Sequence, residues 1–185
     1  MSNIDIHTIV IHCSATQNGV KLARNGKTAA QRIDEMHAQR GFKRRLANYQ
    51  HFNPHLRSIG YHFVIDTDGT IETGRREGEI GAHVKGFNVG SLGICLVGGI
   101  GSEAEKSNGR YTQKQWQSLK YLIQELAERY PDADLVGHRD LSPDLNNDGV
   151  IMPNEWVKTC PGFDVYEYVD NDLVPTVDHI VITGE

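Results

Sequence analysis

Two short and almost uninterrupted apolar runs constrain the fold of this chain more than any other feature of its sequence. They are HTIVIHCSA at residues 7–15 and SLGICLVGG at residues 91–99. Compact runs that are rich in apolar and β-branched residues are typical of buried strands. A sheet built on such strands needs other elements to cover it, and helices are the usual cover.

Two segments with helical spacing supply that cover. Residues 28–40 carry an apolar stripe, and Gly41 ends the predicted helix. Thr112 and Gln115 form a capping-box pattern, and a second apolar stripe follows over residues 116–130. Strands separated by helices indicate an α/β domain.

The remaining elements are shorter. The segment GYHFVIDTDGTIETG at residues 60–74 predicts two strands joined by a turn at Asp68 and Gly69. A short strand is expected at 133–138 and a last helix at 163–173, while the tail from 174 alternates like a strand without an obvious partner. Because one strand pair is a hairpin, the central β-sheet is expected to be mixed and flanked by helices.

Length and charge further limit the class of protein and the partners that the chain could have. A chain of 185 residues favours a single domain, here 1–185 with a core at about 7–170 and a tail at 171–185. The net charge of −5 argues against a nucleic-acid partner, and the basic KRR at residues 43–45 is expected to be a solvated turn. No apolar run approaches the ~18 residues of a membrane span. The first residues resemble a strand rather than a signal peptide, so cytoplasmic synthesis is expected.

The cysteines argue against a disulfide framework, because there are three of them. Alternation along a strand puts Cys13 and His12 on opposite faces, so they are not expected to meet as a nucleophile and its base. Cys13 and Cys95 are therefore expected to be buried core residues. Cys160 stands before Pro161, which favours an extended backbone there.

His12, His138 and Cys160 form a candidate metal set. Both histidines lie at or near the ends of predicted buried strands. Two imidazoles and a thiolate suit zinc, and three protein ligands leave a fourth position for water, as in catalytic zinc sites. By spacing alone a chance trio stays an alternative, because the chain has nine histidines.

The stretch GHRDLSPDLNNDGVIMPNEW at residues 137–156 carries two further motifs. HRDL opens a kinase catalytic loop, but Leu145 occupies the place of the required asparagine and the other kinase motifs are missing. The second motif matches a calcium-binding loop through side chains or a carbonyl at Asp144, Asn146, Asp148, Val150 and Glu155. Pro143 prevents a regular entering helix, and a surface turn rich in Asn, Asp and Gly stays the alternative.

Five sequence blocks follow one another along the chain: IVIHCSAT, IGYHFVIDTDGTIETGR, GAHVKGFNVGSLGICLVGG, GHRD and KTCPGFDV. Together they resemble the zinc-dependent N-acetylmuramoyl-L-alanine amidases of the bacteriophage lysozyme and peptidoglycan recognition protein family, over residues 8–165. The resemblance implies that zinc is bound by His12, His138 and Cys160. The calcium-like loop then lies between two ligands as an inserted segment.

The resemblance also implies roles for other residues. Tyr61 and Lys158 fall on catalytic positions of the family, with their separate roles left open, and His83 and Asn88 fall on positions that line the substrate cleft. The other histidines are expected to be surface or core residues.

The implied activity is hydrolysis of the amide between N-acetylmuramic acid and L-alanine in bacterial peptidoglycan by zinc-activated water. A monomeric phage endolysin, released through a separate pore protein, is the expected setting. The alternative is a non-catalytic peptidoglycan-binding module; such relatives commonly lack the cysteine ligand, which is present here as Cys160.

Overall fold

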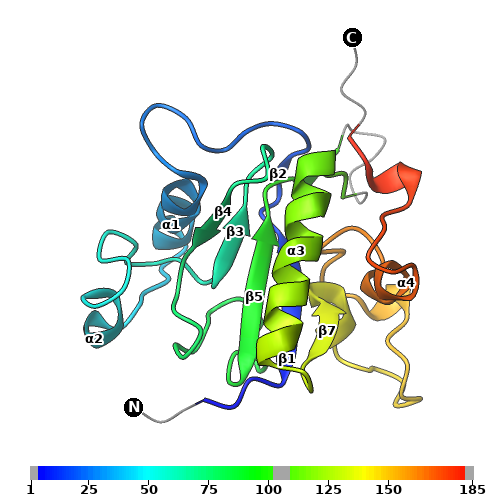
Figure 1. Ribbon diagram of the computed structural model, residues 1–185. Helices are drawn as coiled ribbons and strands as arrows, with labels where there is room; N and C mark the ends of the chain where they lie inside the picture. The colour runs from blue at the N-terminus through cyan, green and yellow to red at the C-terminus, as the bar shows by residue number, and fades with distance from the viewer. Residues whose placement is uncertain (1–3, 102–108, 182–185) are drawn as a thin grey trace.

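A computed structural model describes residues 4–101 and 109–181, and its centre is a mixed sheet (Figure 1). Five strands lie in the order β4-β3-β5-β1-β7. Their bounds are β1 Thr8–Cys13, β3 Phe63–Ile65, β4 Ile71–Thr73, β5 Ser91–Leu96 and β7 Asp134–Gly137. All neighbours are parallel except the β3-β4 hairpin. The predicted α/β class and mixed sheet are confirmed.

A separate pair of short parallel strands, β2 (Thr16–Gln17) and β6 (Gly99–Ile100), extends from the ends of β1 and β5. Residues 102–108 carry the polar sequence SEAEKSN, which predicts a loop, and they lie outside the described residues.

Four α-helices are present in the described residues: α1 Ala29–Gln39, α2 Leu46–Tyr49, α3 Gln113–Arg129 and α4 Val165–Asp170. Both long helices begin with a complete capping box, Thr28 with Gln31 and Thr112 with Gln115. Reciprocal bonds of this kind satisfy two backbone N–H groups that the first helical turn leaves unpaired. No helix in the described part of the chain is long and apolar enough to cross a membrane.

The two faces of the sheet are covered differently. Ile9 and Ile11 point toward α3 and share its core with Trp116, Leu119 and Leu126. α1 packs on the opposite side, where Val64 and Cys95 of the sheet join a second apolar cluster with α1 residues. Since side chains alternate along β1, His12 lies on the face away from α3.

The predicted strand in the tail is wrong for residues 177–179, which form a turn of 3₁₀-helix. The tail also has a partner. Tyr111 N–H donates to the His179 carbonyl at 2.9 Å, and Val181 N–H donates to the Tyr111 carbonyl at 2.9 Å. These two hydrogen bonds form one parallel bridge between Tyr111 and Ile180, and they pair backbone groups of the tail without a full strand. Residues 182–185 lie outside the described residues.

The expected solvated turn at 43–45 is wrong for its central residue. Arg44 is buried, and its guanidinium donates two hydrogen bonds to the Glu79 carboxylate, at 2.9 and 2.6 Å. It also donates to the carbonyl of Leu56 at 2.7 Å. A buried pair persists when such bonds complete its hydrogen-bonding needs. This pair joins the segment before α2 to the loop between β4 and β5.

Candidate functional site

The sheet itself brings the two candidate histidine ligands together. β1 and β7 are parallel neighbours with Ile11 opposite Gly137, so the next residues, His12 and His138, leave the same edge side by side. Cys160 comes from the segment before α4. Its carbonyl accepts a hydrogen bond from the backbone of Arg139 at 2.9 Å, which fixes it beside the end of β7.

The donor atoms of these three residues all lie within 4.8 Å of one another. His12 Nδ1 and His138 Nδ1 are 3.0 Å apart, and Cys160 Sγ lies 3.9 Å from His12 Nδ1. Within the described residues this is the one group of three His, Cys, Asp or Glu side chains that converges in this way. Two imidazole nitrogens and one sulfur suit a zinc ion.

A cleft of about 120 Å³ opens beside this cluster. Its other lining residues come from the end of β1, from α1 and the segment after it, and from the loops around it: Cys13, Ser14, Ala15, Ile33, Met36, His37, Arg40, Phe42, Tyr61, Ala82, His83 and Lys158. Tyr61 and Lys158, which the sequence assigned to this site, therefore do lie at the cleft.

Burial sets the protonation of the groups in the cleft. It lowers the pKa of His138 to about 4, helped by the positive charge of Lys158. Burial and the neighbouring imidazoles of His83 and His138 also lower the pKa of His12. At neutral pH these imidazoles are therefore uncharged, which is the form that binds metal ions.

Tyr61 behaves in the opposite sense for the same reason. Burial raises its pKa well above the ordinary value, so the phenol stays protonated at neutral pH. Its ring centroid lies 5.1 Å from that of His12 and 5.1 Å from that of His37. The phenol can thus donate a proton or a hydrogen bond near the metal cluster, but it cannot serve as a ready base.

His83 and Asn88 have partners within the protein. His83 lines the cleft, and its Nδ1 lies 3.0 Å from His12 Nε2. The side-chain oxygen of Asn88 accepts the backbone N–H groups of His83 and Val84, at 2.7 and 3.0 Å. Asn88 therefore shapes the loop that carries His83.

The expectation of a buried core cysteine is confirmed for Cys95, which is 0% exposed, but not for Cys13. Cys13 is half-buried and lines the cleft, and its backbone N–H donates to Cys160 Sγ at 3.1 Å. The strand ends here and the chain turns at Ala15, whose φ is +54°. Alternation along a strand cannot predict contacts made where the strand ends.

The sequence did not indicate that His37 lies at the cleft, since it was expected to be a core or surface residue without a role in the site. It is buried in α1, accepts the Gly60 N–H at 2.9 Å and lies along the cleft. Its spacing within an apolar helix stripe could not distinguish a cleft wall from a core position.

The carboxylates of the calcium-like loop accept hydrogen bonds from backbone N–H groups of the same loop. Glu155 accepts from Leu145 N–H and Met152 N–H, both at 2.8 Å. Asp144 accepts from Gly149 N–H at 2.8 Å. Among the described residues, its acidic side chains do not form a group that could hold a metal ion as His12, His138 and Cys160 do. The loop as it stands fits the surface-turn alternative, and calcium binding stays a prediction.

Arg139 closes this loop onto the cluster. Its guanidinium carbon lies 4.3 Å from the centroid of the Trp156 ring, and its Nη2 donates to Asp164 at 2.6 Å. Since Arg139 follows His138 and its backbone bonds to Cys160, both ends of the intervening segment are held at the site.

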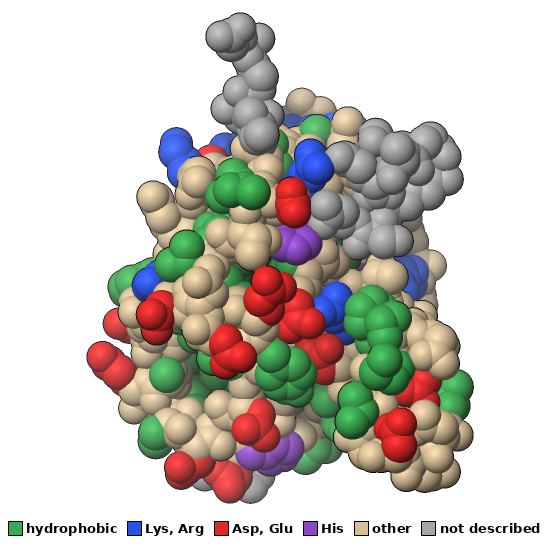
Figure 2. All heavy atoms as spheres, turned by 90° about the vertical axis from the view of Figure 1, so that its right-hand side faces the viewer, with side chains coloured by type: hydrophobic (Ala, Val, Ile, Leu, Met, Phe, Trp, Pro, Cys, Tyr) green, Lys and Arg blue, Asp and Glu red, His purple; other side chains and the backbone are tan. Residues whose placement is uncertain are grey.

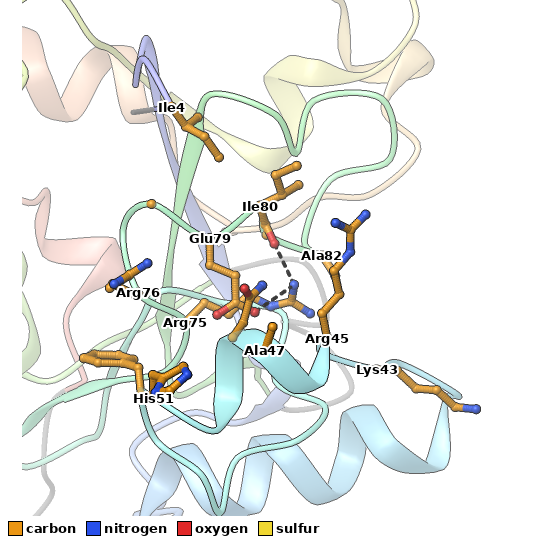
Figure 3. A pocket seen from close by; sticks show the side chains of 14 residues that line it. Ile4, Lys43, Arg45, Ala47, His51, Arg75, Arg76, Glu79, Ile80 and Ala82 are labelled. Atoms are coloured by element: carbon orange, nitrogen blue, oxygen red, sulfur yellow. Dashed lines mark hydrogen bonds and ion pairs between the residues drawn. The ribbon is translucent and has the colours of Figure 1, made fainter. Parts of the chain in front are cut away.

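Figure 3 shows a larger basic pocket of about 570 Å³, and Ala82 lines both this pocket and the cleft. α2 forms one wall, and Arg45 extends from it toward Ala82. The described residues that line it include four cations and one carboxylate: Lys43, Arg45, Arg75, Arg76 and Glu79.

The charge of this pocket is local. Figure 2 shows a different face, around α4, on which acidic side chains gather, as the net charge of −5 leads one to expect. Within the pocket, Nη2 of the buried Arg75 has no hydrogen-bond partner among the described residues. A concentrated positive charge on a negative chain favours anionic ligands.

Comparison with known proteins gives a consistent result. The family model described as N-acetylmuramoyl-L-alanine amidase matches residues 2–163. The endolysin of Klebsiella phage KP32 is 32% identical over 171 residues, which cover 92% of this chain and 90% of that protein.

Two solved structures have a similar fold. N-acetylmuramoyl-L-alanine amidase LysC from Clostridium intestinale URNW has a TM-score of 0.61 at 28% identity, covering 92% of this chain and 87% of that one. Bumblebee PGRP-SA has a TM-score of 0.59 at 21% identity, covering 95% and 87%, and shows likeness of fold alone.

The donor cluster predicts metal binding that can be measured directly. Protein stripped with a chelator is expected to bind one Zn²⁺ per chain, because the three donors converge and both imidazoles are neutral. Cys160→Ser is expected to lower the Zn²⁺ affinity at least tenfold, measured by competition with a chromophoric chelator. The control His55→Ala, which alters an exposed histidine that lines neither the cleft nor the basic pocket, is expected to keep wild-type affinity. Equal affinity of wild type and Cys160→Ser would contradict the site.

Proposed function

This chain belongs to the N-acetylmuramoyl-L-alanine amidase family, and from that premise we infer that it is a peptidoglycan hydrolase that cleaves the amide between N-acetylmuramic acid and L-alanine, as a bacteriophage endolysin. The resemblance seen in the sequence is confirmed by the match over residues 2–163. The observation that carries the proposal is the convergence of His12, His138 and Cys160 beside a cleft that the last two of them line.

We propose zinc as the metal of this site. When bound by two imidazoles and a thiolate, zinc polarises a carbonyl and lowers the pKa of a bound water toward ~7. The neutral imidazoles favour this ion, because no proton has to leave them before it binds.

The other proposed roles belong to the chain's own side chains. Tyr61 stays protonated, so its hydroxyl is suited to donate a hydrogen bond to an oxygen on which negative charge develops. The ammonium of Lys158 lies at the exposed rim of the cleft and supplies positive charge beside the same oxygen. His83 is proposed to line the glycan-peptide cleft, with Asn88 supporting its loop.

The alternative, a peptidoglycan-binding module without catalysis, fits less well. Its members commonly lack the cysteine ligand, whereas this chain keeps Cys160 together with Tyr61 and Lys158 at one cleft. A single domain over 1–185, a monomeric state, synthesis in the host cytoplasm and release through a separate pore protein stay predictions.

Digestion of purified peptidoglycan tests the activity. Wild-type protein is expected to release new L-alanine amino ends without new reducing sugar ends, because only the amide is cut. Cys160→Ala is expected to lower that rate at least 10³-fold, since loss of the metal removes several kcal/mol of transition-state stabilisation. New reducing ends would identify a glycosidase and reject the proposal, and a substrate that is bound but never cut would support the alternative.

The basic pocket predicts a contribution to substrate affinity. Peptide stems of peptidoglycan carry free carboxylates, and the lining cations are placed to attract them. Arg45→Glu is expected to raise KM about three- to tenfold with little change in kcat. Lys114→Glu makes the same charge change on α3, which covers the other face of the sheet, and is expected to have no such effect. Equal KM values for both variants would argue against the pocket.

Calcium binding by the 144–155 loop can be tested by thermal unfolding. At a Ca²⁺ concentration 100 times its Kd, binding adds about 2.7 kcal/mol to stability, which raises Tm by roughly 5–10 °C in a chain of this size. Asp148→Asn keeps the acceptor for Val150 N–H but removes a charge, so it is expected to weaken the effect. If Ca²⁺ changes neither Tm nor zinc retention, the loop is a turn held by its own hydrogen bonds.

A further inference from the structure

The imidazole of His83 lies within hydrogen-bonding distance of the imidazole of His12, a proposed zinc ligand. Its Nδ1 lies 3.0 Å from His12 Nε2, and the two rings meet edge to face at 84° with centroids 5.0 Å apart. His12 Nε2 is the ring nitrogen on the side away from the donor cluster, because Nδ1 faces His138 and Cys160. His83 therefore contacts His12 from behind the proposed metal position.

This geometry decides where the protons are. A nitrogen that binds a metal carries no proton, so neutral His12 with Nδ1 as ligand must carry its proton on Nε2. With a metal ion on Nδ1 of His12, that N–H would have His83 Nδ1 as its acceptor at 3.0 Å, and a neutral His83 would then carry its own proton on Nε2. The next group in line is Ser91 Oγ, 3.4 Å from His83 Nε2, and Ser91 donates its own proton to the carbonyl of Phe87 at 2.5 Å.

The ring of His83 is held in this place by its surroundings. A Cβ on Gly81 would lie 2.4 Å from His83 Cδ2, and a Cβ on Gly93 would lie 2.8 Å from His83 Cγ. Only residues without a side chain leave room for the ring at these two positions. The backbone of His83 is fixed as well, since its N–H donates to Asn88 Oδ1 at 2.7 Å.

We propose that His83 is a positioning residue for the metal site: it accepts the Nε2 proton of His12 and so fixes the tautomer and the ring orientation that present His12 Nδ1 to zinc. Ligand histidines in zinc proteins generally donate their second N–H to a fixed acceptor, and loss of that acceptor typically costs 10–100-fold in metal affinity or activity. The inference rests on the proposed function only in taking His12 as a zinc ligand.

Two substitutions separate this role from a role in packing or substrate contact. His83→Phe fills the space but removes the acceptor, and is expected to lower Zn²⁺ affinity about 10–100-fold. His83→Asn places an amide oxygen near the position of Nδ1 and is expected to stay within about threefold of wild type. The control His55→Phe changes an exposed histidine that lines neither the cleft nor the basic pocket, and is expected to have wild-type affinity.

The readout is Zn²⁺ competition with a chromophoric chelator, followed by steady-state kinetics on peptidoglycan. Unchanged affinity in His83→Phe would overturn the proposal, and a rise in KM at unchanged affinity would assign His83 to substrate binding instead. Equal losses in His83→Asn and His83→Phe would also overturn it, because the acceptor would then not be what matters. Failure of wild type to bind Zn²⁺ would reject the metal site itself, and Zn²⁺ binding without cleavage would reject only the enzymatic function.

A measurement on the wild type does not depend on whether a variant folds. In zinc-loaded protein, long-range ¹H–¹⁵N correlation of the imidazoles is expected to show His12 and His83 both protonated at Nε2, with the His12 N–H slow to exchange. A proton on His83 Nδ1 would contradict the proposal, because that nitrogen could then not accept from His12.

Discussion

The parallel pairing of β1 with β7 is the constraint on which the site depends. In a parallel pair the carboxyl ends of both strands reach the same edge of the sheet, and the register sets Ile11 opposite Gly137. His12 and His138 are 126 residues apart in the chain, yet their Nδ1 atoms lie 3.0 Å apart. The core around Ile9, Ile11 and α3 holds this register, because a shift by one residue would turn His12 into the apolar core.

Burial then determines the chemistry of the cleft. Taking a titratable group out of water disfavours its charged form, so the imidazoles of His12 and His138 are neutral and the phenol of Tyr61 keeps its proton. The same environment therefore prepares metal ligands and a hydrogen-bond donor. The rim is different, because Lys158 is exposed and the neighbouring basic pocket carries several cations. The site thus combines a buried region of low dielectric around His12 and Tyr61 with an exposed, positively charged rim.

Hydrogen bonds between side chains and the backbone hold several irregular segments around the site. Asn88 holds the loop of His83, Asp140 accepts the Gly137 N–H at 2.7 Å, and Glu155 joins both ends of its own loop. Arg139 adds the stack on Trp156. Such contacts give irregular segments a defined shape without regular secondary structure.

The sequence by itself determined the α/β class, both long helices with their capping boxes, the β3-β4 hairpin and the family, because these depend on local periodicity and on motifs with fixed spacing. It also predicted which residues form the metal cluster, although that prediction came from the family resemblance and not from the spacing of the residues. Only the tertiary structure decided which contacts form where regular elements end. Cys13 turned out to line the cleft, Arg44 to be buried with Glu79, His37 to form a cleft wall and His83 to contact His12. These contacts join segments that are distant in the chain and follow no repeating pattern, so the packing of the folded chain alone determines them.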